Sequence, residues 1–137
     1  MKTKPVLGVE DVKTIIQASS KYALEHGWNV TISVVDDGGH LLGLLRLDGA
    51  APMTAVIAPG KARTSALGRK ESSAYEESIN GGRYAYLSVP SPVMLEGGVP
   101  IVVDGQVIGA VGVSGVKSSQ DVEIGKAGIA ALLASQH

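Results

Sequence analysis

The chain of 137 residues contains no cysteine. This absence excludes disulfides, zinc–thiolate clusters, iron–sulfur ligation and thiol nucleophiles. It leaves the cellular compartment open, because many proteins of either redox compartment lack cysteine.

The chain also lacks an excess of charge and any long apolar run. Charged residues make up 18% of the sequence and the formal net charge is −1, so there is no basic field of the kind that dominates nucleic-acid binding. Its apolar runs are far shorter than the roughly 20 residues of a membrane helix. Charged residues at positions 10, 11 and 13 interrupt the region where a signal peptide needs an apolar core. We therefore expect a cytoplasmic protein that binds neither nucleic acid nor membrane.

The clearest structural signal lies in residues 96–115, where two apolar runs flank the pair Asp104-Gly105. Such a pattern is typical of a β-hairpin and therefore of an antiparallel sheet. The second run contains Gly109, Gly112 and Gly115. Glycine in a strand indicates a bulge or the close approach of another backbone or a ligand. A closely packed helix is the favoured interpretation here, and a bound ligand is the alternative.

The remaining pattern predicts helices around a second hairpin, without the strand–helix–strand alternation of a parallel sheet. We expect an α+β fold of one domain, 1–137, in which helices pack on the antiparallel sheet. In chain order, the elements expected outside residues 96–115 are a helix over 9–26 closed by Gly27, a hairpin of strands 29–36 and 40–47, two helices or one broken at Pro59-Gly60 over 51–69, a short helix over 71–78 and a last helix over 121–135.

Histidine is scarce, with only His26, His40 and His137 present and no metal-binding spacing among them. We therefore expect no multi-histidine metal site. His26 falls at a predicted helix end, where capping is favoured over ligand binding. His40 follows a turn, and ligand binding and plain exposure both stay open for it. A haem needs only one or two axial groups, for which the neutral candidates are His26, His40, Met53 and Met94.

Two cations are candidates for anion binding. Arg46 interrupts a leucine-rich strand, so we expect its stem to be partly buried and its guanidinium to need an acidic partner or an anionic ligand. Lys61 is expected at a helix start, where backbone amides would add to its charge. For Lys61, solvation and anion binding both stay open.

Two carboxylates are candidates for a general base. Glu96 precedes two glycines and an apolar strand, where it would abstract a proton or pair with one of the cations. Asp36 lies beside a turn, and capping of local backbone amides is the favoured role there. Ser114 lacks the G-x-S-x-G surroundings of a hydrolase nucleophile.

Six motifs follow one another along nearly the whole chain: Asp36-x-Gly38-Gly39-His40, Arg46-x-Asp48-Gly49-Ala50, Gly60-Lys61-Ala62-Arg63-Thr64, Glu96-Gly97-Gly98-Val99-Pro100-Ile101, Gly112-Val113-Ser114-Gly115 and Gln120-Asp121. In this order they resemble the motifs of the GlcG-like family. This family includes the extracellular haem-binding protein S of streptomycetes and the C-terminal domain of PduO-type proteins. The resemblance implies a profilin-like α-β-α arrangement with a five-stranded antiparallel sheet, assembly into dimers or higher oligomers, and haem or a corrinoid-linked role in some members.

Together these observations predict an oligomeric accessory protein of small-molecule catabolism that binds a small anionic molecule or a haem-like cofactor. Arg46 and Lys61 would meet carboxylates, and His40 or His26 would be the axial or hydrogen-bonding group. No cofactor other than haem, and no separate metal ion, is expected. The alternative is an enzyme acting on a small carboxylate, with Glu96 or Asp36 as general base.

Overall fold

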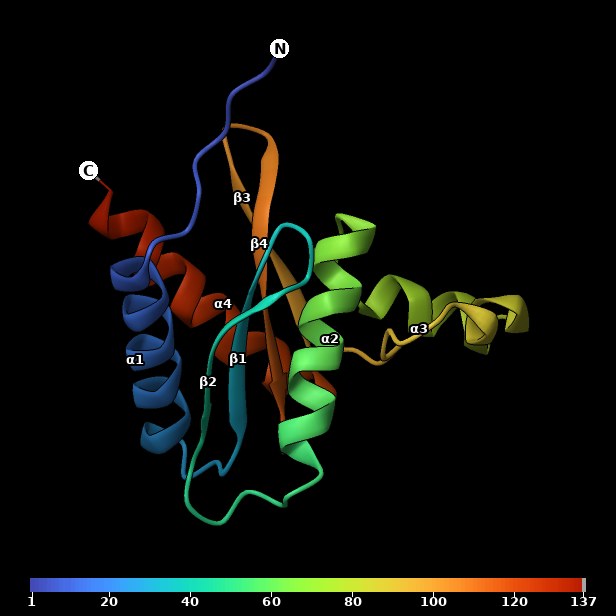
Figure 1. Ribbon diagram of the computed structural model, residues 1–137. Helices are drawn as coiled ribbons and strands as arrows, with labels where there is room; N and C mark the ends of the chain where they lie inside the picture. The colour runs from blue at the N-terminus through green and yellow to red at the C-terminus, as the bar shows by residue number, and fades with distance from the viewer. Residues whose placement is uncertain (137) are drawn as a thin grey trace.

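A computed structural model describes residues 1–136, so His137 lies outside the described residues. Along the chain, two strand hairpins are separated and flanked by helices (Figure 1). The elements are α1 (Val9–Glu25), β1 (Thr31–Asp36), β2 (Leu41–Arg46), α2 (Thr54–Gly68), α3 (Ser73–Asn80), the 3-10 helix η1 (Tyr84–Ser88), β3 (Gly98–Val103), β4 (Gln106–Ser114) and α4 (Ser118–Ser135).

The described strands form one antiparallel sheet with the order β2-β1-β4-β3. Both predicted hairpins are confirmed, and Asp104 and Gly105 turn the second one with positive φ angles of 51° and 75°. The expectation of five strands is wrong, because the sheet has four. The chain between η1 and β3 is strand-free, and Pro90 and Pro92 there have no backbone N–H to donate to a ladder.

Helices cover both faces of the sheet, which confirms the α+β class and the α-β-α layering. In Figure 1, α1 and α4 lie on one face and α2 on the other. The period of two along the central strands explains this division. Ile32 and Val113 face the larger core beneath α1 and α4, whereas Val35 and Ala110 pack with alanines of α2.

Small residues let α2 approach the sheet closely. A Cβ atom added to Gly112 would collide with the carbonyl oxygen of Ala58 and lie 2.6 Å from the backbone nitrogen of Ala62. The close neighbour of this strand position is therefore a helix, as the sequence favoured, and not a ligand.

Helix α2 is continuous through Pro59, so the prediction of two helices or a broken one is wrong. Proline in a helix interior loses one hydrogen bond and crowds the preceding turn. Burial outweighs that cost here, because Ala58, Gly60 and Ala62 on either side of the proline are buried against the sheet. Lys61 consequently lies inside the helix, away from the free amides at its start.

The first and last helices pack against each other. Helix α1 ends as predicted, with Gly27 at a φ of 70° beyond its C-cap. Helix α4 begins at Ser118 rather than at 121, because the carbonyl of Lys117 accepts hydrogen bonds from the amides of Gln120 and Asp121, each at 2.9 Å. No helix within residues 1–136 is long and apolar enough to cross a bilayer.

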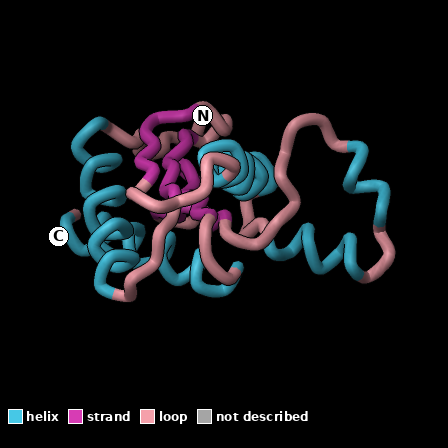
Figure 2. Tube along the Cα trace, turned by 90° about the horizontal axis from the view of Figure 1, so that it is seen from below, coloured by secondary structure: helices cyan, strands magenta, loops and turns pink. Residues whose placement is uncertain are grey.

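One segment stands away from these layers. Residues 73–92, which we call the arm, contain α3 and η1 and project sideways from the sheet and its helices (Figure 2). Neither α3 nor η1 contains a buried residue. The arm therefore contributes little to the core and leaves room for a pocket at its base.

Candidate functional site

A pocket of about 250 Å³ lies between the C-terminal half of α2 and the arm. Its walls are mostly apolar, and two of them are tyrosine rings packed edge to face with centroids 5.1 Å apart. We call it the arm pocket. It is lined by Thr64, Leu67, Gly68, Tyr75, Tyr86, Val89, Pro90, Pro92 and Met94.

Each tyrosine ring of the arm pocket carries a cation on its face. The Lys70 Nζ lies 4.6 Å from the centroid of the Tyr75 ring, and the Arg83 guanidinium carbon lies 5.0 Å from that of Tyr86. Both distances are within the range of cation–π attraction. Lys70 and Arg83 do not themselves line the pocket, so positive charge lies beside its aromatic wall, an arrangement that suits a flat ligand with acidic groups.

The turn between β1 and β2 lies against the same part of α2. A Cβ atom on Gly39 would lie 3.5 Å from Cγ of Leu67, a residue that lines the arm pocket, and 3.4 Å from Cγ of Arg63. In this turn Asp36 Oδ1 accepts hydrogen bonds from the amides of Gly38 (2.9 Å) and His40 (3.0 Å) and contacts the His40 ring Nδ1 at 3.2 Å.

Asp36 therefore has the capping arrangement that the sequence favoured. Desolvation opposes ionisation of this carboxyl, but the hydrogen bonds from the two amides and from the His40 ring outweigh it and lower its pKa. A lowered pKa makes Asp36 a weaker base. The His40 side chain is 78% exposed, so most of its ring is in contact with solvent.

Lys61 is a buried residue that the sequence did not place correctly. Its Nζ donates hydrogen bonds to the carbonyl of Val113 at 3.0 Å and to Asp121 Oδ2 at 3.1 Å. The two side chains of this ion pair are only 4% and 2% exposed. The Lys61 ammonium is therefore already bonded inside the protein.

Glu96 lies close to this pair and is half-buried. The pKa of Asp121 is raised to about 6, because desolvation and, to a smaller extent, the nearby charge of Glu96 outweigh the lowering by Lys61 and by the amide of Val116. The backbone amide of Glu96 lies 3.4 Å from Glu76 Oε2. The structure thus brings together Lys61 and Glu96, two of the predicted site residues, around a third residue, Asp121.

Arg46 lies elsewhere. It is the last residue of β2, opposite Thr31 and at the far end of the hairpin from Asp36. Its side chain is exposed, so the expected burial of its stem is wrong: β2 is an edge strand, and its outer flank has no neighbouring strand among residues 1–136.

His26 follows α1 and stacks between two aromatic rings. Its ring centroid lies 4.4 Å from that of Tyr22 and 4.5 Å from that of Trp28, and its Nδ1 bonds the Tyr22 carbonyl at 2.8 Å. This is the helix-end role that the sequence favoured. The six residues of β1 separate the His26 end of the sheet from the His40 turn.

The aromatic walls of the arm pocket were missed by sequence reasoning. The signal was present, because three of the four tyrosines, at positions 75, 84 and 86, fall within twelve residues of a chain that is only 4% aromatic. Met94 was recognised as a candidate ligand, but nothing in the pattern placed it beside those rings.

Comparison with known proteins identifies relatives along most of the chain. The model of the family described as haem degrading protein HbpS-like matches residues 7–130. Protein GlcG of Escherichia coli strain K12 is 54% identical over 114 residues, which cover 83% of this chain and 85% of that protein.

Solved structures share the fold. A double mutant of Streptomyces reticuli HbpS superposes with a TM-score of 0.87 at 27% identity, covering 95% of this chain and 89% of that one. A PduOC:heme complex superposes with a TM-score of 0.83 at 26% identity, covering 93% and 95% of the two chains.

Proposed function

Since this chain belongs to the HbpS-like family, we propose that it is an accessory protein that binds a flat, amphiphilic, anionic ligand of the haem class in the arm pocket. The observation that carries the proposal is the pair of tyrosine rings inside the pocket, each with a cation on its face. Apolar rings match the body of such a ligand, and Lys70 and Arg83 match its carboxylates. The PduOC relative, solved as a complex with haem, supports the same ligand class.

The arm pocket, at about 250 Å³, has room for only part of a haem, so such a ligand would project from it, and the residue types at the pocket are ones that hold haem. Met94 supplies a thioether in the pocket wall, and methionine sulfur is one of the axial ligands that proteins use for haem iron. His40, on the turn against Leu67, is the nearest of the predicted histidine ligands to this part of α2. When bound, haem supplies a redox-active iron whose properties depend on its axial ligands. Lys61 is not assigned to the ligand carboxylates, because its ammonium is held by Asp121 and Val113.

The test is a haemin titration of the full chain, followed at the Soret band. We expect a saturable change in the wild-type protein, a changed band position in Met94→Leu, and about tenfold weaker binding in Arg83→Gln, because one charge-assisted contact contributes about 1.4 kcal/mol or more. His26→Asn, on the far end of the sheet, is the matched control and should bind as the wild type does. Equal isotherms and spectra for all four proteins would overturn the proposal.

The same proposal places the protein in the cytoplasm, in small-molecule catabolism. Fluorescence microscopy of the tagged full chain tests it, and a signal confined to the cell envelope or medium would contradict it.

A second function is favoured by one observation, the position of Glu96 beside the buried Lys61–Asp121 pair. A half-buried carboxylate next to a buried ionic group is a candidate general base for a small carboxylate substrate. Turnover of 2-hydroxy or 2-oxo acids that Glu96→Gln abolishes, while Glu76→Gln retains it, would support this function. Equal turnover by both variants would remove Glu96 as the base.

A further inference from the structure

Strand β2 presents an unusual surface for the edge of a sheet. Its four leucines, Leu41, Leu42, Leu44 and Leu45, are between 37% and 56% exposed. The outer flank of β2 has no neighbouring strand among the described residues. Proteins usually protect such edges with lysine, proline or a covering segment. Residues 41–45 contain neither lysine nor proline, so this edge is suited to pairing.

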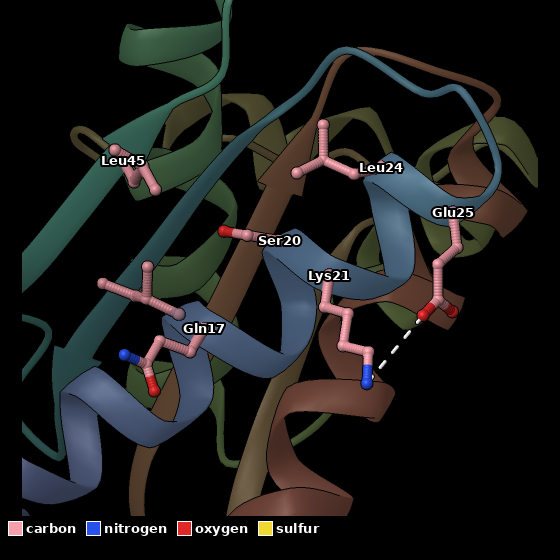
Figure 3. Close-up of a pocket in the computed structure, with 7 residues that line it drawn as sticks. Gln17, Ser20, Lys21, Leu24, Glu25 and Leu45 are labelled. Atoms are coloured by element: carbon pink, nitrogen blue, oxygen red, sulfur yellow. Dashed lines mark ion pairs between the residues drawn. The ribbon is translucent and has the colours of Figure 1, made fainter.

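Apolar grooves continue this surface onto α1. One groove of about 520 Å³ runs between Leu45 and α1, where Leu24 and the side chain of Ser20 face it (Figure 3). A second groove of about 330 Å³ lies between residues 42–44 and the N-terminal half of α1. The Ser20 hydroxyl is buried without a hydrogen-bond partner among residues 1–136. The leucines and grooves together form one apolar face that extends beyond the strand itself.

We propose that β2 pairs antiparallel with β2 of a second copy of this chain, about a two-fold axis at Gly43. The segment Leu41-Leu42-Gly43-Leu44-Leu45 has the same residue types in both directions, which suits an interface made of the same patch on both subunits. Gly43, at the axis, packs its backbone closely against α1. A Cβ there would point at α1, only 2.7 Å from Val12 Cγ1.

Charge complementarity selects a second copy over an unrelated partner. With Gly43 on the axis, Arg46 of one copy pairs with His40 of the other, since both are three residues from the axis and the β-bulge at Leu42, where β2 shifts register against β1, recurs in both copies. Within residues 1–136, Arg46 makes no ion pair, and Oδ2 of Asp36 accepts no hydrogen bond because all its contacts are through Oδ1. Pairing therefore brings an unpartnered guanidinium to an unpartnered carboxylate oxygen, twice per dimer.

This arrangement completes a site that neither copy has alone. Asp36, His40 and Arg46 were all candidate ligand or base residues, yet one chain holds Arg46 at the opposite end of the hairpin from the other two. The two-fold axis brings Asp36 and His40 of one copy next to Arg46 of the other, in each of two equivalent sites across the interface. The β2 interface does not depend on ligand binding at the arm pocket.

Disulfide trapping tests the register directly, because residues 1–136 contain no cysteine to compete. In the proposed pairing Leu42, the bulged residue of β2, lies across from Leu44 of the other copy, and a disulfide between the two positions needs a Cα separation of about 4.4–6.8 Å. We expect an equimolar mixture of Leu42→Cys and Leu44→Cys full chains to form a mixed disulfide at least about tenfold faster than Leu87→Cys, an exposed arm variant, forms its own. Rates equal to that control would overturn the proposal.

The oligomeric mass gives the second test, measured by light scattering at about 100 µM, because association depends on protomer concentration. Leu44→Asp should halve the mass, or at least weaken association about a hundredfold, because it places two like charges in the apolar strand pair. Arg46→Glu should weaken association about tenfold and Arg46→Lys should restore most of it. Circular dichroism checks that each variant is folded. A monomeric wild-type protein, or a mass that folded Leu44→Asp leaves unchanged, would refute the interface.

Discussion

Lys61 and Asp121 form an ion pair of 3.1 Å that is almost completely removed from solvent. The pair joins the middle of α2 to the first turn of α4, on opposite faces of the sheet, around the end of β4. Its formation explains why a lysine occupies a helix interior among alanines. Removing or titrating either partner should therefore change the stability of the fold.

Replacing Lys61 by methionine should destabilise the fold by about 3–5 kcal/mol, because the Asp121 carboxylate would be left buried without its partner. The measurement is the free energy of unfolding in urea at pH 7. Lys126→Met is the matched control, since Lys126 and Glu71 pair at 3.7 Å on the surface. That control should cost no more than about 1 kcal/mol. A loss below about 1 kcal/mol in Lys61→Met, within the range of a surface pair, would contradict a structural role for the buried pair.

Asp121 should make the free energy of unfolding decrease as the pH rises from about 4 to above 6. Its folded pKa of about 6 is higher than the ordinary value of 3.8, so between these values the folded state holds a proton that the unfolded state has released. The free energy of unfolding contributed by this group is therefore greatest below about pH 4 and falls as the pH rises through about 6.

The check is a comparison of urea unfolding at pH 4.5 and pH 7. The wild-type protein should lose about 1–3 kcal/mol of stability across this interval from Asp121 alone. Asp121→Asn should lack that decrease, whatever its absolute stability. Identical pH slopes in the two proteins would exclude Asp121 as the titrating group.

Replacement by alanine should have opposite effects on stability at two glycines, one at the contact between α2 and the sheet and one in α4. Gly112→Ala should destabilise by about 1–3 kcal/mol or more, because the new methyl group meets backbone atoms of α2 that cannot move independently. Gly125→Ala in α4 is the control: its methyl would lie 3.5 Å or more from its neighbours, and alanine favours the helix by up to about 1 kcal/mol. Thermal unfolding of both variants distinguishes them, and equal Tm values would be inconsistent with this packing.

Gly68→Ala should weaken ligand binding at the arm pocket while leaving the stability of the core nearly unchanged. A Cβ there would lie 2.8 Å from Cε2 of Tyr75, so the tyrosine ring must move out of its present place in the pocket. Because that ring is on the arm, we expect the free energy of unfolding to change by less than about 1 kcal/mol. Haemin affinity should fall at least about tenfold, which corresponds to about 1.4 kcal/mol of binding free energy. Unchanged affinity together with a folded protein would argue against Tyr75 as a wall of the ligand site.

Local patterns predicted much of the fold. Helix α1 follows from apolar spacing and Gly27, and the hairpins follow from Asp104-Gly105 and residues 37–39, because these signals are short-range. Helix α2 was harder to predict, since the cost of Pro59 is local whereas the compensating burial against Gly112 comes from a distant strand. The strand count was wrong because it came from resemblance rather than from the two visible hairpins.

The site was predictable only in part, for a related reason. The turn role of Asp36 and the helix-end role of His26 depend on neighbours within a few residues, and both agree with the structure. The partner of Lys61 is Asp121, sixty residues away, and no local pattern pairs them. The exposure of Arg46 depends on strand order, which periodicity does not specify.

The projection of the arm has a kinetic consequence. Backbone amides of α3 and η1 are in a segment with no buried residue, so they should exchange with solvent by local opening, whereas those of the central strand β4 should exchange only when the whole fold opens. The two walls of the arm pocket should therefore differ in amide hydrogen exchange, which is slow in α2 and fast in the arm. The rate at which a ligand enters the pocket would then follow the rate at which the arm opens. A bound ligand would slow the hydrogen exchange of the backbone amides of Tyr75 and Tyr86.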